Sequence, residues 1–476
     1  MSQSLRTVLV ALFAVTLFGG PTSLAIAAPP TTAPKRVLAA KRVPAAPWGK
    51  KVGVMLQGFH WHSSSNALTA KDGKGWYEVV DERAPEIGKH FNAIWLPPAS
   101  RAAVEDVHGP TAQGYLPYDL HDFHSSYGSP EKLRVTLSDL KAHGVMPVAD
   151  IVLNHISPRA FIKNNGQPYK LDAANDHFLN LSVNDIVKES GGTGAVDTGA
   201  RFTLVADVDH TSAGAQRAYG KMIHLLQGVG FEGLRYDFAK GFSPKTIEHY
   251  NDDAKPKFSV AELWDDFHDA GSHRDQLLKY VADTGYKTSA FDFTTKAVLQ
   301  DAVVKREFWR LRDASGKAAG LIGVAPEYAV TFVDNHDTGS SPGGNGKGGQ
   351  KHWEFPGGQV MQGYAYILTH PGIPTVYWPH YFDWQSPNKP TPMKNDIDAL
   401  LEIRKSVGIE ANSPMRIMAA DGEKYAAFIS GTHGMIAMKI GPGAWSPPKG
   451  ERWKLVADGN DYAVWTKLPK AKAKKN

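Results

Sequence analysis

Apolar runs of strand length alternate along this chain with amphipathic stretches of helix length. Eight runs have the length and composition of buried strands, at 52–59, 91–97, 146–153, 233–237, 258–263, 289–293, 329–334 and 373–378. Eight amphipathic stretches interleave with them, at 76–89, 130–143, 213–227, 244–253, 273–283, 295–312, 357–369 and 395–406. This alternation is typical of βα units around a parallel sheet. It predicts an α/β fold, a (β/α)8 TIM barrel over residues 48–409.

Two regions depart from the alternation. Residues 156–206, rich in Gly, Asn and Asp, separate the third strand from its helix. A loop of that length is usually functional or forms a small domain of its own, so we expect a protruding domain there. After residue 410 the chain changes to short alternating segments and turns such as Asp458-Gly-Asn-Asp461. These predict a C-terminal antiparallel β-sheet domain over 410–468.

The two ends of the chain differ from the rest. Residues 1–28 combine Arg6, a following apolar run and Ala25-Ile-Ala27, which matches a secretory signal peptide and predicts a secreted, extracellular protein. Pro, Ala, Thr and basic residues at 29–47 predict an extended linker. The basic tail at 469–476 holds much of the formal net charge of +5, so this charge does not indicate a nucleic-acid partner.

Composition limits the remaining classes of protein. Beyond the signal, no stretch approaches the roughly 20 apolar residues of a spanning helix, so we expect no membrane residence. The chain has no cysteine, so an exported protein of this sequence would need a metal ion or plain packing in place of disulfides. Acidic clusters are therefore candidate ion sites. We expect a monomer.

Three predicted strands end in charged residues. The segments are Gly233-Leu-Arg-Tyr-Asp-Phe-Ala-Lys-Gly241, Phe258-Ser-Val-Ala-Glu-Leu-Trp264 and Ala329-Val-Thr-Phe-Val-Asp-Asn-His-Asp337. The carboxyl ends of parallel barrel strands share one rim, so these residues can converge on one substrate. Two carboxyl groups about 5 to 5.5 Å apart can cleave a glycosidic bond with retention of configuration.

Asp237 and Glu262 lie at the ends of adjacent predicted strands and suit this chemistry. Asp237 would attack the anomeric carbon while Glu262 protonates the leaving oxygen. Arg235, on the same strand face as Asp237, would favour the ionised nucleophile by charge pairing. Glu262 would need surroundings that raise its pKa. Asp337 would supply a third charge against an oxocarbenium-like transition state.

Other side chains near the predicted rim could bind a sugar. His155 and His336 could hydrogen-bond sugar hydroxyls. Trp61, Tyr115 and Trp264 are candidates for stacking on sugar faces, for which core packing is the alternative.

The chain resembles the α-amylases of glycoside hydrolase family 13, and the plant-type branch in particular. Four regions carry the likeness in the family's order, Asp150-Ile-Val-Leu-Asn-His155, Gly233–Gly241 as quoted above, Val260-Ala-Glu-Leu-Trp264 and Phe332-Val-Asp-Asn-His-Asp-Thr-Gly339. Further similar segments are Gln57-Gly-Phe-His-Trp61, Asp197-Thr-Gly-Ala200, Asp207-Val-Asp-His210 and Gly459-Asn-Asp-Tyr-Ala-Val-Trp465. The likeness spans about 48–466 and implies a catalytic barrel, a protruding domain B and a C-terminal β-domain.

The resemblance also implies roles for single residues. It makes Asp237 the nucleophile, Glu262 the general acid/base and Asp337 the transition-state stabiliser. Substrate contacts are implied for His155, Arg235, Lys240 and His336.

One calcium ion is implied by the same resemblance. Asn154, Asp197 and Asp207, with the backbone carbonyl of Gly241, match the family's ion site between domain B and the barrel. Such oxygen ligands suit a hard cation. Asp209 is an alternative to Asp207, and loop capping is the alternative role for these acids.

Taken together, the residues and the resemblance predict a secreted, calcium-dependent retaining hydrolase that cleaves internal α-1,4-glucosidic bonds of starch, glycogen and maltooligosaccharides. An exo-acting maltooligosaccharide-forming amylase or a transglycosylase of the same fold would use the same carboxylates and stays open. A non-catalytic glucan-binding protein is disfavoured, because a binder has no need of a nucleophile paired with an acid. Nucleic-acid binding lacks an interleaved aromatic platform.

Overall fold

The computed structural model describes residues 43–49, 52–70, 72–103, 111–159, 167–172, 174–342, 350–383 and 393–467. The predicted signal peptide, most of the predicted linker and the predicted basic tail lie outside the described residues.

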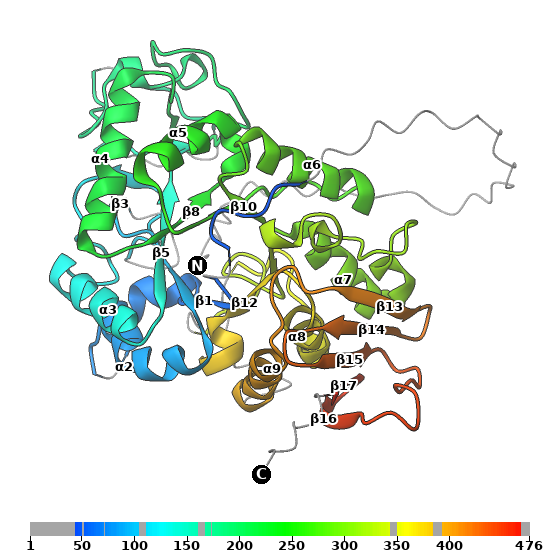
Figure 1. Ribbon diagram of the computed structural model, residues 1–476. Coiled ribbons are helices and arrows are strands. Elements are labelled where there is room, and N and C mark those ends of the chain that lie inside the picture. The colour runs from blue at the N-terminus through cyan, green and yellow to red at the C-terminus, as the bar shows by residue number, and fades with distance from the viewer. Residues whose placement is uncertain are drawn as a thin grey trace, which may run out of the picture.

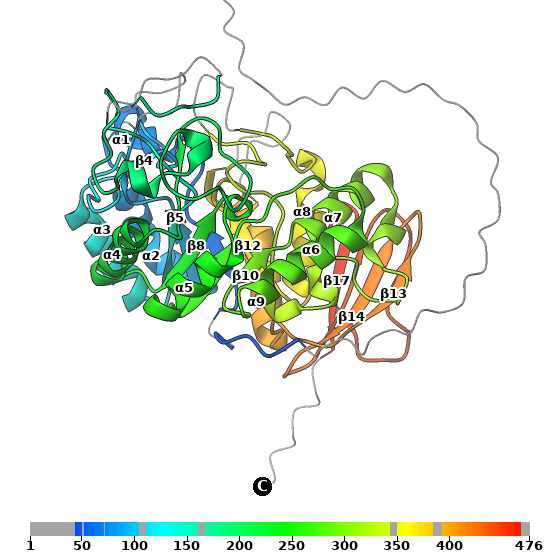
Figure 2. The ribbon, with the colours of Figure 1, turned by 90° about the horizontal axis from the view of Figure 1, so that it is seen from above.

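Eight parallel strands close into a barrel at the centre of the molecule (Figures 1 and 2). They are β1 (Met55–Gln57), β2 (Ala93–Leu96), β5 (Met146–Val152), β8 (Gly233–Asp237), β9 (Phe258–Ala261), β10 (Ser289–Phe291), β11 (Ala329–Phe332) and β12 (Ile373–Tyr377). Each falls within a strand predicted from the sequence. All of their residues are buried on both faces, as expected of a parallel sheet covered by helices. The predicted TIM barrel is confirmed.

Helices surround the barrel strands (Figure 2). They are α2 (Trp76–His90), α3 (Pro130–Ala142), α4 (Ala213–Val229), α5 (Pro244–Ala254), α6 (Ala270–Asp283), α7 (Phe293–Lys305), α8 (Val360–Thr369) and α9 (Lys394–Val407). Ser129 and Ser243 accept backbone N–H groups at the starts of α3 and α5, each before a proline at the first helical position.

Three predicted helices have a boundary that is wrong by three residues or more. The helix predicted at 273–283 starts already at Ala270. The helix predicted at 295–312 ends at Lys305, because Arg306 adopts the left-handed conformation with φ of 55°. The chain continues as a separate 3₁₀ turn, η5 (Phe308–Leu311). The helix predicted at 357–369 starts only at Val360, after the 3₁₀ turn η8 (Gly357–Gln359).

The segment between β5 and α4 leaves the barrel and returns through a two-stranded antiparallel pair. Strand β6 (His155–Ile156) pairs with β7 (Ala206–Asp207), and two 3₁₀ turns, η2 (Val183–Asp185) and η3 (Lys188–Ser190), lie between them. A second small pair, β3 (Arg101–Ala102) with β4 (Pro117–Asp119), precedes it. The remaining short elements are η1 (Trp61–Ser65), α1 (Asn66–Thr69), η4 (Ala239–Gly241), η6 (Leu321–Gly323), η7 (Pro326–Tyr328) and a π-helical turn, η9 (Pro379–Asp383).

A five-stranded antiparallel sheet follows α9, as predicted. Its order is β13 (Met415–Ala420), β14 (Tyr425–Ser430), β15 (Met435–Ile440), β17 (Tyr462–Lys467) and β16 (Lys454–Gly459). In Figure 1 this orange-to-red sheet lies against α8 and α9. Gly441 N–H donates to Gln362 Oε1 of α8 at 3.2 Å, and the Tyr425 hydroxyl lies 2.9 Å from His370 Nε2 just beyond that helix. Sheet and barrel therefore share one hydrophobic core.

Among the described helices, none combines the length and the apolar character needed to cross a membrane.

Candidate active site

Arg235 is the centre of a buried charged cluster where β5, β8 and β9 meet. Its Nη1 donates to Asp237 Oδ1 at 2.6 Å and to Asp150 Oδ1 at 2.8 Å, and its Nη2 lies 2.7 Å from Glu262 Oε1. The sheet register explains part of this arrangement, since Asp150 stands opposite Arg235 and Val152 opposite Asp237 on the neighbouring strand. These side chains therefore share one face of the barrel wall.

The carboxyl groups of Asp237 and Glu262 lie around the same guanidinium, and their interaction lowers the pKa of Asp237 while raising the pKa of Glu262. This interaction favours Glu262 over Asp237 as the carboxyl that holds a proton. Burial raises the pKa of Asp237 to about 6, although Arg235 acts in the opposite direction. Burial also raises the pKa of Glu262, which accepts the Phe238 N–H at 3.2 Å. The expected pairing of Arg235 with Asp237 is present, but desolvation outweighs it.

Asp337 is the fourth carboxyl of the cluster, after Asp150, Asp237 and Glu262. Burial and the nearby charge of Glu262 raise the pKa of Asp337 well above its usual value. Its Oδ2 lies 3.3 Å from His336 Nε2. Burial and Arg235 hold the pKa of His336 far below its usual value, so the ring is neutral. The Gln57 amide lies 2.9 Å from His336 Nδ1, which leaves the ring proton on Nε2, facing Asp337.

Two partly exposed aromatic rings line up beside His336. Tyr115 stacks on His336 with ring centroids 5.2 Å apart, and Trp61 stacks on Tyr115 at 6.2 Å. The Tyr115 hydroxyl donates to Asp150 Oδ2 at 2.8 Å, and its carbonyl lies 2.8 Å from His155 Nε2. The structure thus brings together the three predicted carboxyls, Arg235 and all four of the predicted residues Trp61, Tyr115, His155 and His336.

Lys240 and Trp264 lie beside the cluster rather than within it. Lys240 Nζ lies 3.3 Å from Asp265 Oδ1, and the Trp264 ring stacks on Phe293 at 5.4 Å. Both follow directly on strand ends of the same rim, Lys240 in η4 and Trp264 after β9.

The four predicted calcium ligands come from four segments of the chain that the fold brings together. The β6 and β7 pair sets His155 opposite Asp207, and Val208 N–H donates to the Asn154 carbonyl at 2.9 Å. Ala200 N–H donates to the Lys240 carbonyl at 2.9 Å, which holds the 197–200 turn against η4.

Three of these four residues carry a buried oxygen without a hydrogen-bond donor. The atoms are Asn154 Oδ1, Asp197 Oδ2 and Asp207 Oδ2. Burial and the negative charge of Asp197 raise the pKa of Asp207 to about 8, and the nearest cation, Arg201 Nε, is 4.0 Å from Asp207 Oδ2. A Cβ on Gly241 would lie 2.0 Å from Asn154 Oδ1, so only glycine lets this backbone approach. This donor set fits a hard cation such as calcium.

Asp209 is engaged elsewhere. Its Oδ2 accepts Ala195 N–H at 2.7 Å, and its Oδ1 accepts the N–H and hydroxyl of Thr211 at 2.9 and 2.6 Å. Burial raises the pKa of Asp209, but these hydrogen bonds outweigh it and the pKa is lowered. The geometry therefore favours Asp207 over Asp209. The described residues hold no group of three or more acidic or histidine side chains placed to hold a metal, so a cation here would depend on amide and carbonyl oxygens as well.

Comparison with known proteins places the chain in a family. Residues 406–466 match the model of the α-amylase C-terminal β-sheet domain. A probable α-amylase 2 of Arabidopsis thaliana is 38% identical over 425 residues, which cover 87% of this chain and 94% of the relative. The chain belongs to the α-amylase family. It is a glycoside hydrolase of that family, and the resemblance seen in its motifs is confirmed.

Two further proteins that are similar to this α-amylase-family chain are not themselves named α-amylases. A glucan 1,4-α-maltotetraohydrolase of Roseateles saccharophilus is 32% identical over 414 residues, 82% of this chain and 66% of the relative. A cyclomaltodextrin glucanotransferase of three domains superposes with a TM-score of 0.63 at 16% identity, covering 88% of this chain and all of that one. The structural likeness supports the fold alone.

Sequence reasoning did not assign a role to two residues of this α-amylase-family site. Asp150 opens one of the family-like motifs, and its carboxylate accepts hydrogen bonds from Arg235, from the Tyr115 hydroxyl and, at 3.0 Å, from the indole N–H of Trp95. A charged residue in the middle of an otherwise apolar strand was the signal. Phe238 adopts φ of 45°, which directs its N–H to Glu262, and no sequence pattern marks that conformation.

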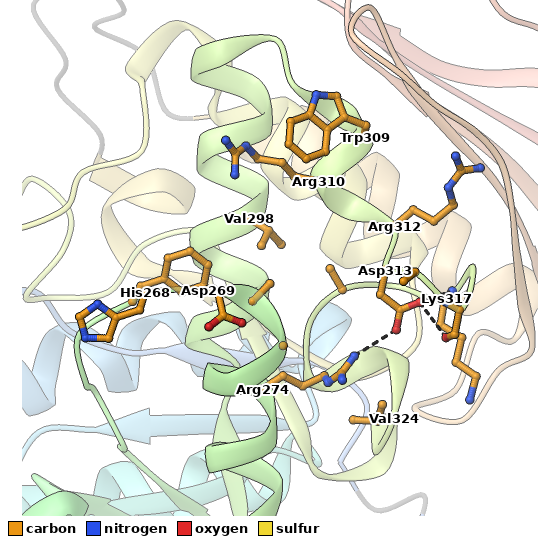
Figure 3. A pocket seen from close by; sticks show the side chains of 16 residues that line it. His268, Asp269, Arg274, Val298, Trp309, Arg310, Arg312, Asp313, Lys317 and Val324 are labelled. Carbon is orange, nitrogen blue, oxygen red and sulfur yellow. Dashed lines mark hydrogen bonds and ion pairs between the residues drawn. The ribbon is translucent and has the colours of Figure 1, made fainter. Parts of the chain in front are cut away.

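The pocket drawn in Figure 3 lies apart from these carboxyl groups. It has a volume of about 640 Å³ and lies between α6, α7 and η5. Trp309 and Arg310 stand at one end of the view, and an Arg274–Asp313 ion pair of 3.0 Å at the other. None of the predicted site residues lines it, so the convergence of carboxyl groups, not cavity size, locates the candidate active site.

Proposed function

We propose that this chain hydrolyses internal α-1,4-glucosidic bonds of starch, glycogen and maltooligosaccharides with retention of anomeric configuration. The observation that carries the proposal is that Asp237 and Glu262 lie against the two different terminal nitrogens of the Arg235 guanidinium, at 2.6 and 2.7 Å. One carboxyl is favoured as the base and the other as the acid, which is the asymmetry that retaining hydrolysis needs. Membership of the α-amylase family supports an α-glucan substrate.

In the first step the ionised Asp237 attacks the anomeric carbon as Glu262 gives its proton to the glycosidic oxygen. The C–O bond breaks, and a glycosyl ester forms on Asp237. In the second step Glu262 takes a proton from water, whose oxygen attacks the anomeric carbon and releases Asp237. Asp337 stabilises the positive charge that develops on the sugar ring in both steps, and His336 Nε2–H is placed to donate toward a sugar oxygen or Asp337.

Neighbouring side chains would position the glucan. The Tyr115 and Trp61 rings, partly exposed and parallel, are suited to a sugar face. His155, held through the Tyr115 carbonyl, is suited to a hydroxyl. Lys240 and Trp264 would contact sugars on the leaving side of the cleaved bond.

Calcium would be held by Asn154, Asp197, Asp207 and the Gly241 carbonyl. When bound, it supplies positive charge to the orphaned oxygens and links the 154–207 excursion to the end of β8. Its contribution is to the shape of the site.

An exo-acting, maltooligosaccharide-forming enzyme is the second candidate. This candidate is favoured by the 32% identity with a glucan 1,4-α-maltotetraohydrolase, over an alignment that covers 82% of this chain. Chromatography of early products from soluble starch distinguishes the two, since a single short product indicates exo action and a broad range indicates endo action. From the signal-like pattern at 1–28 we also propose that the protein is secreted. Separately, we propose that it acts as a monomer.

Proton NMR of the reducing ends formed in the first minutes of starch hydrolysis tests the mechanism. We expect the α-anomer to appear before mutarotation. An early β-anomer would overturn retention through Asp237, and no new reducing ends with calcium present would favour the glucan-binding alternative.

A further inference from the structure

A second buried ion pair lies behind the turn that carries His336 and Asp337. Lys296 of α7 places its Nζ 2.9 Å from Asp334 Oδ1, and neither side chain has any exposed surface. The same Nζ donates to Gln300 Oε1 at 2.6 Å. The third side of the ammonium faces aromatic rings, with Trp353 at 5.4 Å and Phe355 at 5.2 Å.

Asp334 uses its other contacts to close the turn. Its Oδ1 accepts the Thr338 hydroxyl at 2.9 Å, and the Phe355 N–H donates to both of its oxygens at 3.2 and 3.1 Å. His380 Nε2 lies 3.7 Å from its Oδ2. One carboxylate thus connects α7, the 334–338 turn and the 353–355 segment.

The turn held in this way fixes the backbone of Asp337. Asn335 Oδ1 accepts the N–H groups of Asp337 and Thr338 at 3.0 and 2.9 Å. From the opposite side, the His352 N–H donates to the Asp337 carbonyl at 3.0 Å, and the Trp353 N–H donates to the Thr338 carbonyl at 3.3 Å. Asp337 is therefore held on both sides by segments that meet at the Lys296–Asp334 pair.

A buried ion pair does not necessarily stabilise the fold more than apolar side chains filling the same space would. Desolvation of two charges can exceed their mutual attraction, and apolar replacements of similar volume are often as stable. Beyond stability, the pair fixes orientation, because an ammonium bonded to one carboxylate and one amide oxygen holds both acceptor side chains in place. Accordingly, we propose that Lys296 is a positioning residue, which acts through Asp334 to fix the turn that presents His336 and Asp337 to the substrate. This inference rests on the proposed function of Asp337.

The central variant is the double substitution Lys296→Met with Asp334→Asn, which removes both charges and keeps side-chain volume. Removing both partners avoids the uncompensated buried charge that a single substitution leaves. The matched control is Arg404→Met, another buried cation, whose guanidinium caps the carbonyls of Leu368, His370 and Gly372 away from the carboxyl cluster.

Two measurements follow for the wild type and both variants. Hydrogen exchange of the 334–338 backbone amides tests the hold on the turn without reference to activity. Steady-state kinetics on maltooligosaccharides tests its use in catalysis. We expect faster exchange at 334–338 and about 10- to 100-fold lower kcat with little change in KM for the double variant. Arg404→Met should lose melting temperature but keep both the exchange of this turn and kcat.

A double-mutant cycle with Asp337→Asn adds the decisive comparison. If Lys296 acts through Asp337, the double substitution should lower the residual rate of Asp337→Asn by much less than it lowers the wild-type rate. Equal losses in both backgrounds would overturn the inference, as would unchanged exchange or a kcat within twofold of the wild type. A wild-type protein without hydrolytic activity would overturn the proposed function instead, and the exchange measurement would still decide whether Lys296 holds the turn.

Discussion

Asp150 offers a quantitative test of the electrostatics around the nucleophile. Its Oδ1 and the Asp237 Oδ1 lie 2.8 and 2.6 Å from the same Arg235 nitrogen, so they are at most about 5.4 Å apart. Two unit charges at that distance repel by about 3 kcal/mol at an effective dielectric constant of about 20, or about 2 pH units. Asp150 raises the pKa of Asp237, and the substitution Asp150→Asn removes that charge.

The sign of the expected effect follows from the role of Asp237. The nucleophile must be ionised, so a pKa of about 6 places the acidic limb of kcat/KM near that pH in the wild type. With the Asp150 charge removed, and more of the Arg235 charge left to Asp237, ionisation becomes easier. We expect the acidic limb of Asp150→Asn to move down by about 1 to 2 pH units.

The assay is kcat/KM for a chromogenic maltooligosaccharide between pH 3 and 8. A matched control is Asp292→Asn, another fully buried carboxyl, which accepts N–H groups of Thr295 and Ile322 and has no contact with Arg235. This control should keep the wild-type acidic limb even if it melts earlier. An acidic limb of Asp150→Asn that stays in place or moves up would refute the electrostatic reasoning.

Three further outcomes are expected. Glu262→Gln should lower kcat by about 10²- to 10⁴-fold on maltooligosaccharides and by much less on substrates with a good aryl leaving group, measured by comparing the two rates. Calcium at 100 times its Kd should stabilise the wild type by about 2.7 kcal/mol, measured by thermal unfolding with and without chelator, and should leave Asp207→Asn almost unaffected. Trp61→Ala should raise KM by about 2- to 12-fold with a smaller change in kcat, because it removes about 0.5 to 1.5 kcal/mol of ring stacking, and an unchanged KM would exclude Trp61 from sugar binding.

The barrel could be predicted because its signal is local. Each strand is an apolar run buried on both faces, and each is followed by an amphipathic helix, so strand and helix identities follow from composition and period. Boundaries were less predictable where a single backbone conformation ends an element. Helix α7 ends because Arg306 adopts the left-handed backbone conformation, and an arginine in the sequence does not predict that conformation.

The candidate site was predictable where a charge stands at a strand end. Asp237, Glu262 and Asp337 could be identified from the sequence because the rim, at the strand ends, is the part of a barrel that tolerates charged side chains. Asp150 and Lys296 are different, since they lie inside a strand and inside a helix, and their partners come from 85 and 38 residues away. Contacts of that range depend on the closed barrel, which a single sequence does not specify residue by residue.

Helix α8 belongs to the barrel and packs against the C-terminal sheet, which limits where the protein can be cut into separate parts. All ten residues from Val360 to Thr369 are buried, so this helix has no face for water. Without the sheet, the side of α8 that contacts β15 and β17 would become an exposed apolar surface. A catalytic barrel cut free before the sheet would therefore be prone to aggregate, and gene fusions or domain exchanges within this family should carry both parts as a single inherited unit.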